Sequence, residues 1–439
     1  MTSMTKEDVL KSVRENKIKC IHLWFVDILG LLKYFVISPS ELEGAFSEGM
    51  GFDGSSIQGF CRIDASDLVA KPDPTTFTII PSHSNEFYGR MFCDIFNPDG
   101  TPFAGDSRYV LKRSLEKAAK IGYTCYVGPE LEFFYFKKSE GTEVLDTGGY
   151  FDLPPQDMGS DLREDTILNL ERMGIPVEYS HHEVAPSQHE IDLRYQEALV
   201  MADAAVTYRQ TVKEIAMKHG VYATFMPKPI FGQNGSGMHV HQSLFNGKKN
   251  AFFDANDQFS LSDAGKSYIA GLLKHAPEMS AIVCQWVNSY KRLVPGYEAP
   301  AYIAWARRNR SCLVRVPMYK PGKEVATRCE LRCPDPACNP YLAFAIMLSA
   351  GLKGIEEKYV LAEPIEEDIF EMTSEELKKN NIDSMPGTLG EAVEIFAQSS
   401  LAKECVGEHI FNNFIEIKRK EWKEFCIHVS RWEQNRLLP

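Results

Sequence analysis

The chain has 439 residues, which is long for a single hydrophobic core and predicts at least two domains. Apolar residues make up 44% of it and charged residues 25%, proportions typical of a globular protein. The formal net charge of -12 argues against a surface for nucleic acid or anionic membrane, because such surfaces need an excess of Lys and Arg.

The first elements are a helix and a hairpin. Thr5 can cap a helix that runs to about Asn16, with Asp8 in the N3 position of a capping box. Two runs typical of strands follow, at 18–26 and 31–38, and a turn-rich tetrapeptide separates them. The charged start of the chain shows no secretory signal, so we expect a cytoplasmic protein.

The rest of the N-terminal part continues the mixture of strands and helix. A capping-box pattern at 38–41 predicts a second helix that Gly49 can end, and strands are expected at 76–80 and 90–96. This order predicts a small α+β sheet domain. The turn-rich segment 97–102 is the predicted boundary, which gives domains at residues 1–102 and 103–439.

The second part begins with a helix from Ser107 to about Gly122 and then alternates helices with short strands. Its longest apolar run, Tyr341–Leu352, is too short to span a bilayer, and the preceding Asn-Pro pair predicts a buried helix. The eleven cysteines include no CxxC pair. Free thiols in a reducing compartment explain them better than a zinc site does.

The segment Gly128–Phe136, GPELEFFYF, carries the first chemical signal. On a strand, Glu130 and Glu132 share one face, while Leu131 lies on the other. Neighbouring carboxylates repel each other unless a cation or a proton lies between them. Taken alone, the pattern also fits an edge strand with one solvent-exposed face.

The second signal is HHEVAPSQHE, residues 181–190. Pro186 makes one continuous element improbable, so the chain is expected to bend and to direct Glu183 and Glu190 to one point. A solvated charged loop is the alternative for this segment by itself.

The third signal is NGSGMHVHQS, residues 234–243. On a strand, His239, His241 and Ser243 share a face, and the preceding glycines allow a ligand to approach closely. Paired histidines suit a metal or a phosphate, whereas a single buried histidine is usually structural.

The fourth signal is a concentration of basic side chains between 288 and 336. In an acidic protein, this clustering indicates an anionic, phosphate-bearing ligand, although ion pairs between subunits remain an alternative. Glu330 and Arg332 share a strand face. The basic residues are Lys291, Arg292, Arg307, Arg308, Arg310, Arg315, Arg328 and Arg332.

Together, the four signals predict a site for Mg²⁺ or Mn²⁺. Five glutamates and one histidine form an oxygen-rich ligand set that suits hard divalent cations. Metals and arginines together are typical of phosphoryl transfer. The sequence has neither a GxxxxGK[ST] loop nor a GxGxxG motif after a strand, so bound ATP would need another means of holding its phosphates.

Seven segments in order resemble the signature blocks of type I glutamine synthetases. They are FDGSSIQGF, GPELEFFYF, HHEVAPSQHE, NGSGMHVHQS, NSYKRLVPGYEAP, ARRNRS and CELRCPDPACNPYL, between Phe52 and Leu342. The resemblance implies a β-grasp-like N-terminal domain and a larger catalytic domain with a curved antiparallel sheet and flanking helices. It also implies a homododecamer of two stacked hexameric rings with active sites between adjacent subunits.

The implied reaction joins ammonia to glutamate with ATP, through γ-glutamyl phosphate. The resemblance implies two ions in each site, the first held by Glu132, Glu183 and Glu190 and the second by Glu130, His239 and Glu330. Residues matching the ATP site are Glu178, His241 and Ser243, and those matching the glutamate site are Asn234, Gly235, Arg292 and Arg332. Arg310 and Arg315 match residues that neutralise the transferring phosphate.

Two further acids match proton-handling positions. Asp53 matches the residue that binds ammonium and helps deprotonate it, and Glu298 matches the flap glutamate that closes the site. Phe370 lies about where one branch of the family has its adenylylation tyrosine, so adenylylation is not expected. The resemblance to the shorter α subgroup links Arg62 to feedback inhibition.

Two alternatives remain at this stage. One is a related γ-glutamyl ligase for a bulkier amine, which would need open space where Asp53 is expected to bind ammonium. The other is a catalytically inactive structural relative, which should have lost metal ligands, whereas all six matched positions retain Glu or His.

Overall fold

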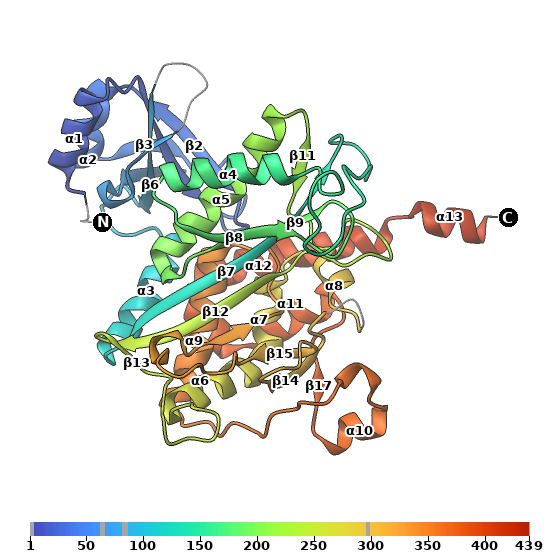
Figure 1. Cartoon of the computed structure of the whole chain (residues 1–439). Helices are drawn as coiled ribbons and strands as arrows, with labels where there is room; N and C mark the ends of the chain where they lie inside the picture. The colour runs from blue at the N-terminus through green and yellow to red at the C-terminus, as the bar shows by residue number, and fades with distance from the viewer. Residues whose placement is uncertain (1–3, 62–65, 81–86, 296–298, 439) are drawn as a thin grey trace.

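Two β-sheets organise the protein (Figure 1). The computed structural model describes residues 4–61, 66–80, 87–295 and 299–438. Within these ranges, a six-stranded sheet forms the N-terminal part and an eleven-stranded sheet forms the centre of the larger part. The α+β class and the two-sheet plan predicted from the sequence are confirmed.

The first sheet has the strand order β2-β1-β6-β4-β3, and β5 pairs with the first residues of β6, next to the pairing of β4 with its last residues. The predicted hairpin is confirmed, since β1 and β2 are antiparallel, whereas β1 and β6 are parallel. Strands β3 and β4 were not predicted. The bounds are β1 Cys20–Val26, β2 Leu32–Ile37, β3 Met50–Asp53, β4 Asp67–Pro72, β5 Thr78–Ile80 and β6 Tyr88–Phe96.

Two helices accompany this sheet. Helix α1, Lys6–Glu15, begins with the predicted capping box, in which Thr5 and Asp8 each accept from the other's backbone N–H. The second predicted capping box is wrong. Ser38 makes no side-chain cap, and the chain forms a 3₁₀ turn at Pro39–Glu41 before α2, Leu42–Ser47.

The second sheet has the order β17-β14-β15-β16-β12-β7-β9-β8, and three short strands pair outside this path. The long strand β7 is central, so the edge-strand alternative for 128–136 is wrong. The bounds are β7 Thr124–Phe136, β8 Val177–His182, β9 Gln188–Leu193, β10 Gln196–Glu197, β11 Tyr222–Thr224, β12 Met238–Asn246, β13 Lys249–Asn250, β14 Tyr302–Ala306, β15 Cys312–Arg315, β16 Cys329–Leu331 and β17 Asp383–Ser384.

Helices pack against the rear face of the second sheet and leave its front face for polar side chains. Tyr208 of α5 donates to the carbonyl of Leu131, and Tyr268 of α6 donates to Gln242 of β12. The helices are α3 Ser107–Lys120, α4 Ser160–Arg172, α5 Ala198–Lys218, α6 Asp263–Lys274, α7 Ala276–Val283, α8 Ser289–Arg292, α9 Pro340–Glu356, α10 Ser374–Lys379, α11 Leu389–Gln398, α12 Ser400–Ile427 and α13 Arg431–Leu437.

Helix α9 confirms the predicted buried helix and also joins the two parts. Asn339 caps it by accepting from the backbone N–H groups of Tyr341 and Leu342. The Nδ2 of Asn339 donates to the carbonyl of Asp27 in the β1–β2 turn, at 3.0 Å. One amide therefore caps the helix and holds the first sheet against the second part.

Arg108 makes a second connection at the start of α3. Its guanidinium is 2.7 Å from a carboxylate oxygen of Asp94, 2.9 Å from Asp73 and 3.0 Å from Asp203. The Arg108 side chain is buried, so its charge depends on these carboxylates. Asp73 and Asp94 belong to the N-terminal part and Asp203 to α5, so the network fixes one part against the other.

The described residues include no helix that is both long and apolar enough to cross a membrane. All eleven cysteines are free, and Cys329, Cys333 and Cys338 are buried. This agrees with the reading of the cysteines as thiols.

Candidate functional site

Cross-strand pairing brings the predicted acidic and histidine residues onto the front face of the second sheet. On β7, Glu132 lies opposite Glu190 of β9, and Glu130 lies opposite His239 of β12. His241 of β12 in turn lies opposite Glu330 of β16. Directly opposed residues project to the same side of a sheet, so segments far apart in the chain form one polar surface.

The first acidic group lies where β7, β8 and β9 meet. It contains Glu132, Glu183 and Glu190, and the structure adds His181. The Nε2 of His181 is 3.4 Å from Oε2 of Glu190, and its Nδ1 is 3.7 Å from Oε1 of Glu183. The predicted bend at Pro186 is confirmed, because residues 183–187 form the turn between β8 and β9.

The second group lies on β7, β12 and β16. The Nδ1 of His239 is 3.3 Å from Oε2 of Glu130 and 3.9 Å from Oε1 of Glu330. His241 comes closer, with its Nε2 2.7 Å from Oε1 of Glu130. Both histidines thus lie beside the Glu130–Glu330 pair. The family resemblance instead implied that His239 binds the metal and His241 contacts ATP.

The electrostatics of the first group suit a bound cation. Burial, and next the charge of Glu183, raises the pKa of Glu132 to about 8. Burial and the charges of Asp192 and Glu132 raise the pKa of Glu190 well above its ordinary value. A divalent cation would relieve this repulsion, and the oxygen-rich donor set fits Mg²⁺ or Mn²⁺.

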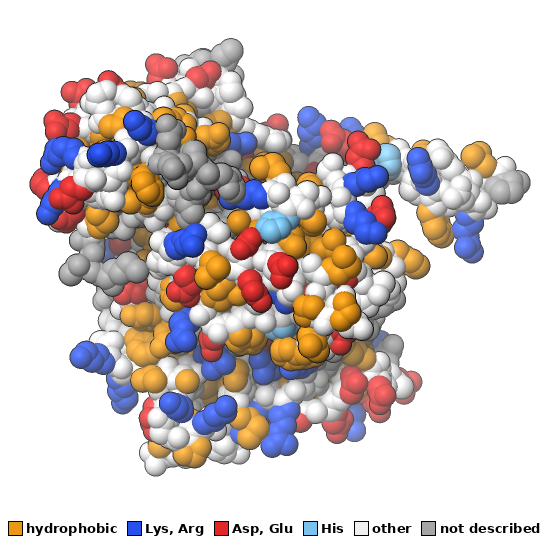
Figure 2. Space-filling model, turned by 45° about the horizontal axis from the view of Figure 1, so that its top comes forward, with side chains coloured by type: hydrophobic (Ala, Val, Ile, Leu, Met, Phe, Trp, Pro, Cys, Tyr) orange, Lys and Arg blue, Asp and Glu red, His pale blue; other side chains and the backbone are white. Residues whose placement is uncertain are grey.

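In the second group, arginines neutralise the charge of Glu330. Burial opposes ionisation of Glu330, but the charge of Arg332 and then of the two site histidines holds its pKa at about 2. Arg315 Nε and Arg332 Nη1 each lie 2.5 Å from a Glu330 oxygen. Figure 2 shows acidic and histidine side chains in the middle of one face, with Lys and Arg below them.

A narrow cavity joins the predicted glutamate-site residues to the first acidic group. Asn234, Gly235, Arg292 and Arg332 line it together with Glu132, Glu183 and His239. A Cβ on Gly235 would lie 2.4 Å from the carbonyl oxygen of Pro227, so this position requires glycine. The nitrogens of Arg292 donate to the carbonyls of Arg332, Cys333 and Pro334, which fixes its guanidinium beside the cavity.

The remaining residues predicted to contact ATP and phosphate lie around this surface. Glu178 is exposed at an irregularity of β8, where the register shifts between Val177 and Tyr179. Ser243 is buried farther along β12 than His241. Arg310 is exposed in the turn between β14 and β15, and its charge acts on Tyr150.

Three front-face residues were not predicted, namely His181, Gln188 and Asp192. Gln188 Nε2 donates to Oε2 of Glu132 at 2.8 Å and to the carbonyl of Gly235 at 3.1 Å. Burial, then the charge of Glu130, raises the pKa of Asp192 to about 7. The two-residue spacing of Gln188, Glu190 and Asp192 was the sequence signal for their shared face.

The other predicted residues lie apart from this surface or outside the described ranges. Asp53 ends β3 in the N-terminal part, where it is exposed and accepts from the backbone N–H of Ser55. Figure 1 shows β3 well separated from β12 and β15. Glu298 and Arg62 lie outside the described residues. Phe370 lies in a 3₁₀ turn, with its ring centroid 6.1 Å from that of Tyr302.

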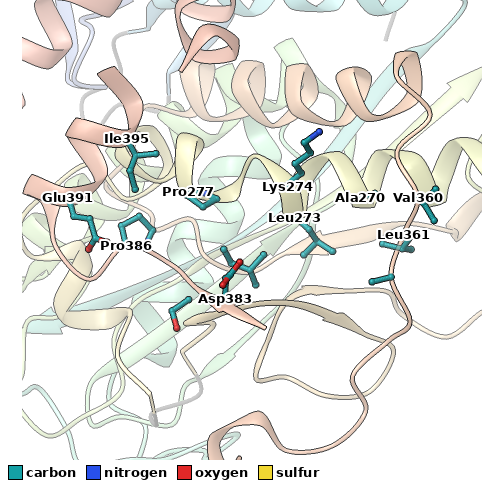
Figure 3. Close-up of a pocket in the computed structure, with 13 residues that line it drawn as sticks. Ala270, Leu273, Lys274, Pro277, Val360, Leu361, Asp383, Pro386, Glu391 and Ile395 are labelled. Carbon is teal, nitrogen blue, oxygen red and sulfur yellow. The ribbon is translucent and has the colours of Figure 1, made fainter. Parts of the chain in front are cut away.

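A larger cavity, of about 600 Å³, lies elsewhere in the second part (Figure 3). Leu273, Pro277, Leu361, Pro386 and Ile395 give it a largely apolar lining, with Lys274, Asp383 and Glu391 also at its wall. None of the predicted site residues lines it. Because the predicted metal ligands and arginines lie elsewhere, we do not assign phosphoryl transfer to this cavity.

Comparisons with known proteins agree over the whole chain. The profile described as "Glutamine synthetase, beta-Grasp domain" matches residues 17–98, and "Glutamine synthetase, catalytic domain" matches residues 104–437. A glutamine synthetase of Mycolicibacterium smegmatis is 52% identical over 99% of both chains, and one of Methanosarcina mazei is 50% identical over 99% of this chain and 98% of the relative. A solved GmaS/ADP complex has a TM-score of 0.90 at 29% identity and covers 98% of this chain and 99% of that chain.

Proposed function

The chain belongs to the type I glutamine synthetase family, and from this premise we propose how its residues carry out the reaction. It is an ATP-dependent ligase that makes glutamine from glutamate and ammonia. The family uses ATP and a divalent metal. The observation that carries the proposal is the cross-strand pairing on one sheet face of Glu130 with His239, of Glu132 with Glu190 and of His241 with Glu330.

Two cation sites fit this surface. Glu132, Glu183 and Glu190 would hold one ion, and Glu130, His239 and Glu330 the other, with Mg²⁺ or Mn²⁺ as the ions. The crowding of buried carboxylates, which raises the pKa values of Glu132 and Glu190, supports the first of these two sites. Divalent ions supply charge stabilisation for the phosphates when bound.

The side chains around the cations hold the substrates. Asn234, Gly235, Arg292 and Arg332 bind glutamate, and their shared cavity supports this role. Arg310 and Arg315 neutralise the phosphate as γ-glutamyl phosphate forms. Glu178, His241 and Ser243 contact ATP.

Two acids manage protons and water. Asp53 binds ammonium and helps to remove its proton, because ammonium is not a nucleophile until it is deprotonated. Glu298 closes the site and accepts a proton from the adduct, which protects γ-glutamyl phosphate from hydrolysis.

A homododecamer of two stacked hexameric rings would bring Asp53 to the metal site of a neighbouring subunit. The separation of β3 from β12 within one chain supports a shared site. The boundary between 102 and 103 follows the end of β6 at Phe96 and precedes α3 at Ser107. The free cysteines support a cytoplasmic location.

Regulation follows from two positions. Phe370 has no hydroxyl, so this chain is not controlled by adenylylation there. Arg62 contributes to feedback inhibition, as the resemblance to the α subgroup implies. Feedback should be weaker in Arg62→Ala when initial rates are measured at increasing glutamine concentration.

The central test measures phosphate release from ATP and glutamate, with and without ammonium, in Mg²⁺. Glu190→Ala should lower the rate at least about 10²–10³-fold, whereas the exposed Glu394→Ala should not change it. Near-normal turnover by Glu190→Ala would contradict the metal assignment.

The subunit-sharing proposal has its own test. Asp53→Ala and Arg310→Ala should each be nearly inactive alone. Mixed oligomers formed by joint unfolding and reassembly should regain activity, because an Arg310→Ala subunit can supply Asp53 to an intact catalytic domain. Mixed oligomers without activity would place the whole site within one chain.

A related γ-glutamyl ligase for a bulkier amine is the second candidate. The retained DGSS segment at Asp53 favours ammonia, since a close anion suits ammonium. Competition between ammonium and methylamine, followed by product mass, distinguishes the two.

A further inference from the structure

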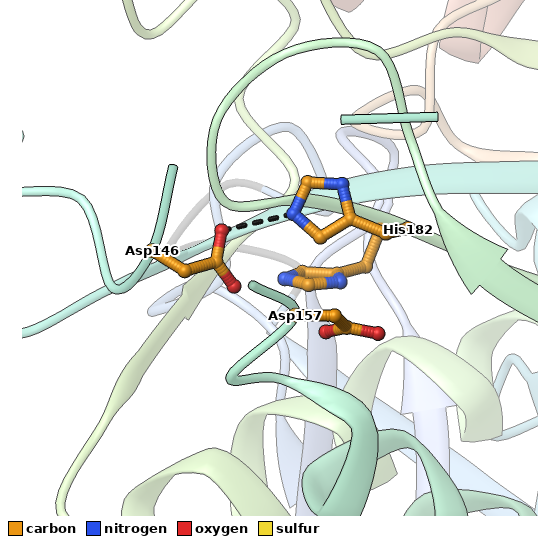
Figure 4. A group of neighbouring side chains, drawn as sticks. Asp146, Asp157 and His182 are labelled. Carbon is orange, nitrogen blue, oxygen red and sulfur yellow. Dashed lines mark hydrogen bonds and ion pairs between the residues drawn. The ribbon is translucent and has the colours of Figure 1, made fainter. Parts of the chain in front are cut away.

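A buried polar network, part of which Figure 4 shows, lies on the opposite side of β8 and β9 from the first acidic group. His182 and His189 are cross-strand partners on β8 and β9, with ring centroids 4.7 Å apart. They alternate with His181 and Glu190 along the strands, so they face away from the site. Asp146, Asp157 and Arg163 surround the two rings, and all five side chains are buried.

Asp146 is the centre of this network. Its Oδ1 accepts from Nε2 of His182 at 2.9 Å and from the backbone N–H of Ser187 at 3.0 Å. Its Oδ2 accepts from the backbone N–H of Met158 at 3.0 Å. One carboxylate thereby joins the loop before α4 to both ends of the β8–β9 turn.

The network reaches the proposed metal ligands through the backbone. His182 Nδ1 donates to the carbonyl of Glu183 at 2.7 Å, because a carbonyl can only accept. At the other end of the turn, Ser187 Oγ accepts from the backbone N–H of Asp146 at 2.9 Å. Ser187 has a φ of 60°, a left-handed conformation that needs such support.

A second branch holds His189, the residue before Glu190. Arg163 pairs with both oxygens of Asp157, at 3.1 and 2.7 Å, and its Nη1 donates to Nδ1 of His189 at 2.8 Å. Since arginine only donates, Nδ1 is the acceptor and Nε2 carries the proton.

This arrangement does not suit a metal, although its four ligand atoms lie within 4.8 Å of one another. The proton on Nε2 of His189 removes the lone pair that a cation would need, and Arg163 already supplies positive charge. Gly159 also packs against the ring, since a Cβ there would lie 2.5 Å from it. The cluster is therefore a hydrogen-bonded support.

We propose that Asp146 is a positioning residue, which fixes Glu183 through His182 and Ser187 so that the first acidic group is preorganised for its cation. This inference rests on the proposed metal role of Glu183 and Glu190. Removing a supporting residue behind metal ligands typically weakens metal binding or activity about 10–100-fold.

The test is Asp146→Asn. Its NH₂ group would face an N–H donor, so the turn loses part of its support without loss of volume. Binding of Mn²⁺ to the apo-oligomer, followed by electron paramagnetic resonance of the free ion, should weaken roughly tenfold or more. The half-saturating Mg²⁺ concentration in turnover should rise similarly, and kcat should recover at saturating metal.

Asp94→Asn is the matched control, because it makes the same change in the Arg108 network away from the site. It should lower the melting temperature but leave both metal measurements unchanged. If Asp146→Asn lowers only the melting temperature, the positioning role is refuted. If Asp146→Asn does not fold, Ser187→Ala is measured in its place. Unchanged Mn²⁺ affinity of Ser187→Ala would also refute the positioning role.

The Glu190→Ala variant separates this inference from the proposed function. Loss of Mn²⁺ binding in Glu190→Ala with normal binding in Asp146→Asn would refute the positioning role alone. Normal Mn²⁺ binding in Glu190→Ala would instead refute the metal assignment.

Discussion

Replacing Glu330 by glutamine should destabilise the protein because two arginines rely on its charge. Glu330 is fully buried, and its oxygens accept from Arg315 and Arg332 at 2.5 Å each. Glutamine keeps the volume but offers one oxygen and no charge. Arg332, only 4% exposed, would then retain a buried charge without its carboxylate.

The magnitude follows from the burial of each partner. A pKa of about 2 instead of 4.5 corresponds to about 3 kcal/mol in favour of the ionised Glu330. Removing one member of a buried pair typically costs about 3–5 kcal/mol. The side chain of Arg315 is 25% exposed, so water lessens its share of the loss. We therefore expect Glu330→Gln to lose about 3–5 kcal/mol.

The assay is denaturant unfolding in EDTA at one protein concentration, after the oligomer of each variant has been checked by size. EDTA removes any contribution from bound metal. Glu330→Gln combined with Arg332→Met should lose at least about 2 kcal/mol less than the sum of the single losses, because the double variant no longer holds the buried Arg332 charge without a carboxylate and leaves only the partly exposed Arg315 unpaired. Additive losses, or a loss below about 1 kcal/mol for Glu330→Gln, would refute this reasoning.

Two other predictions concern the cap of α9 and a buried carboxyl. Asn339→Ala should lose about 2–3 kcal/mol, since it removes a cap and leaves the carbonyl of Asp27 without that donor. Ser430→Ala, which removes the half-buried cap of α13 alone, should lose no more than about 1 kcal/mol in the same unfolding assay, and equal losses would contradict the inter-part role of Asn339. Burial, then the charge of Asp94, raises the pKa of Asp106 to about 6 from 3.8, so the folded state loses stability as pH rises from about 4 to 6. The melting temperature of Asp106→Asn relative to wild type should therefore increase over that pH range, and a constant difference would contradict the assigned pKa.

Local signals explain which parts of the fold the sequence predicted. The Thr5 capping box, the β1–β2 hairpin, the helix from Ser107 and the Asn339 cap depend on residues within a few positions of one another. Strands β3 and β4 were missed because their local pattern is weak and strand pairing orders them, β4 against β6 and β3 against β4. Ser38 has the residue pattern of a cap, but a 3₁₀ turn follows it instead.

The sequence by itself determined the family and the reaction. It also determined which site residues share a strand face, because alternation places Glu130 with Glu132 and His239 with His241. Only the tertiary structure decided which strand lies beside which. That choice places Glu190 opposite Glu132, brings His241 closer to Glu130 than His239, and adds His181 and Gln188 to the site. It also places Asp146 against His182 and Ser187, contacts that no local pattern predicts. The physical reason is that strand register depends on contacts between residues tens to hundreds of positions apart, whereas propensity and alternation act over a few residues.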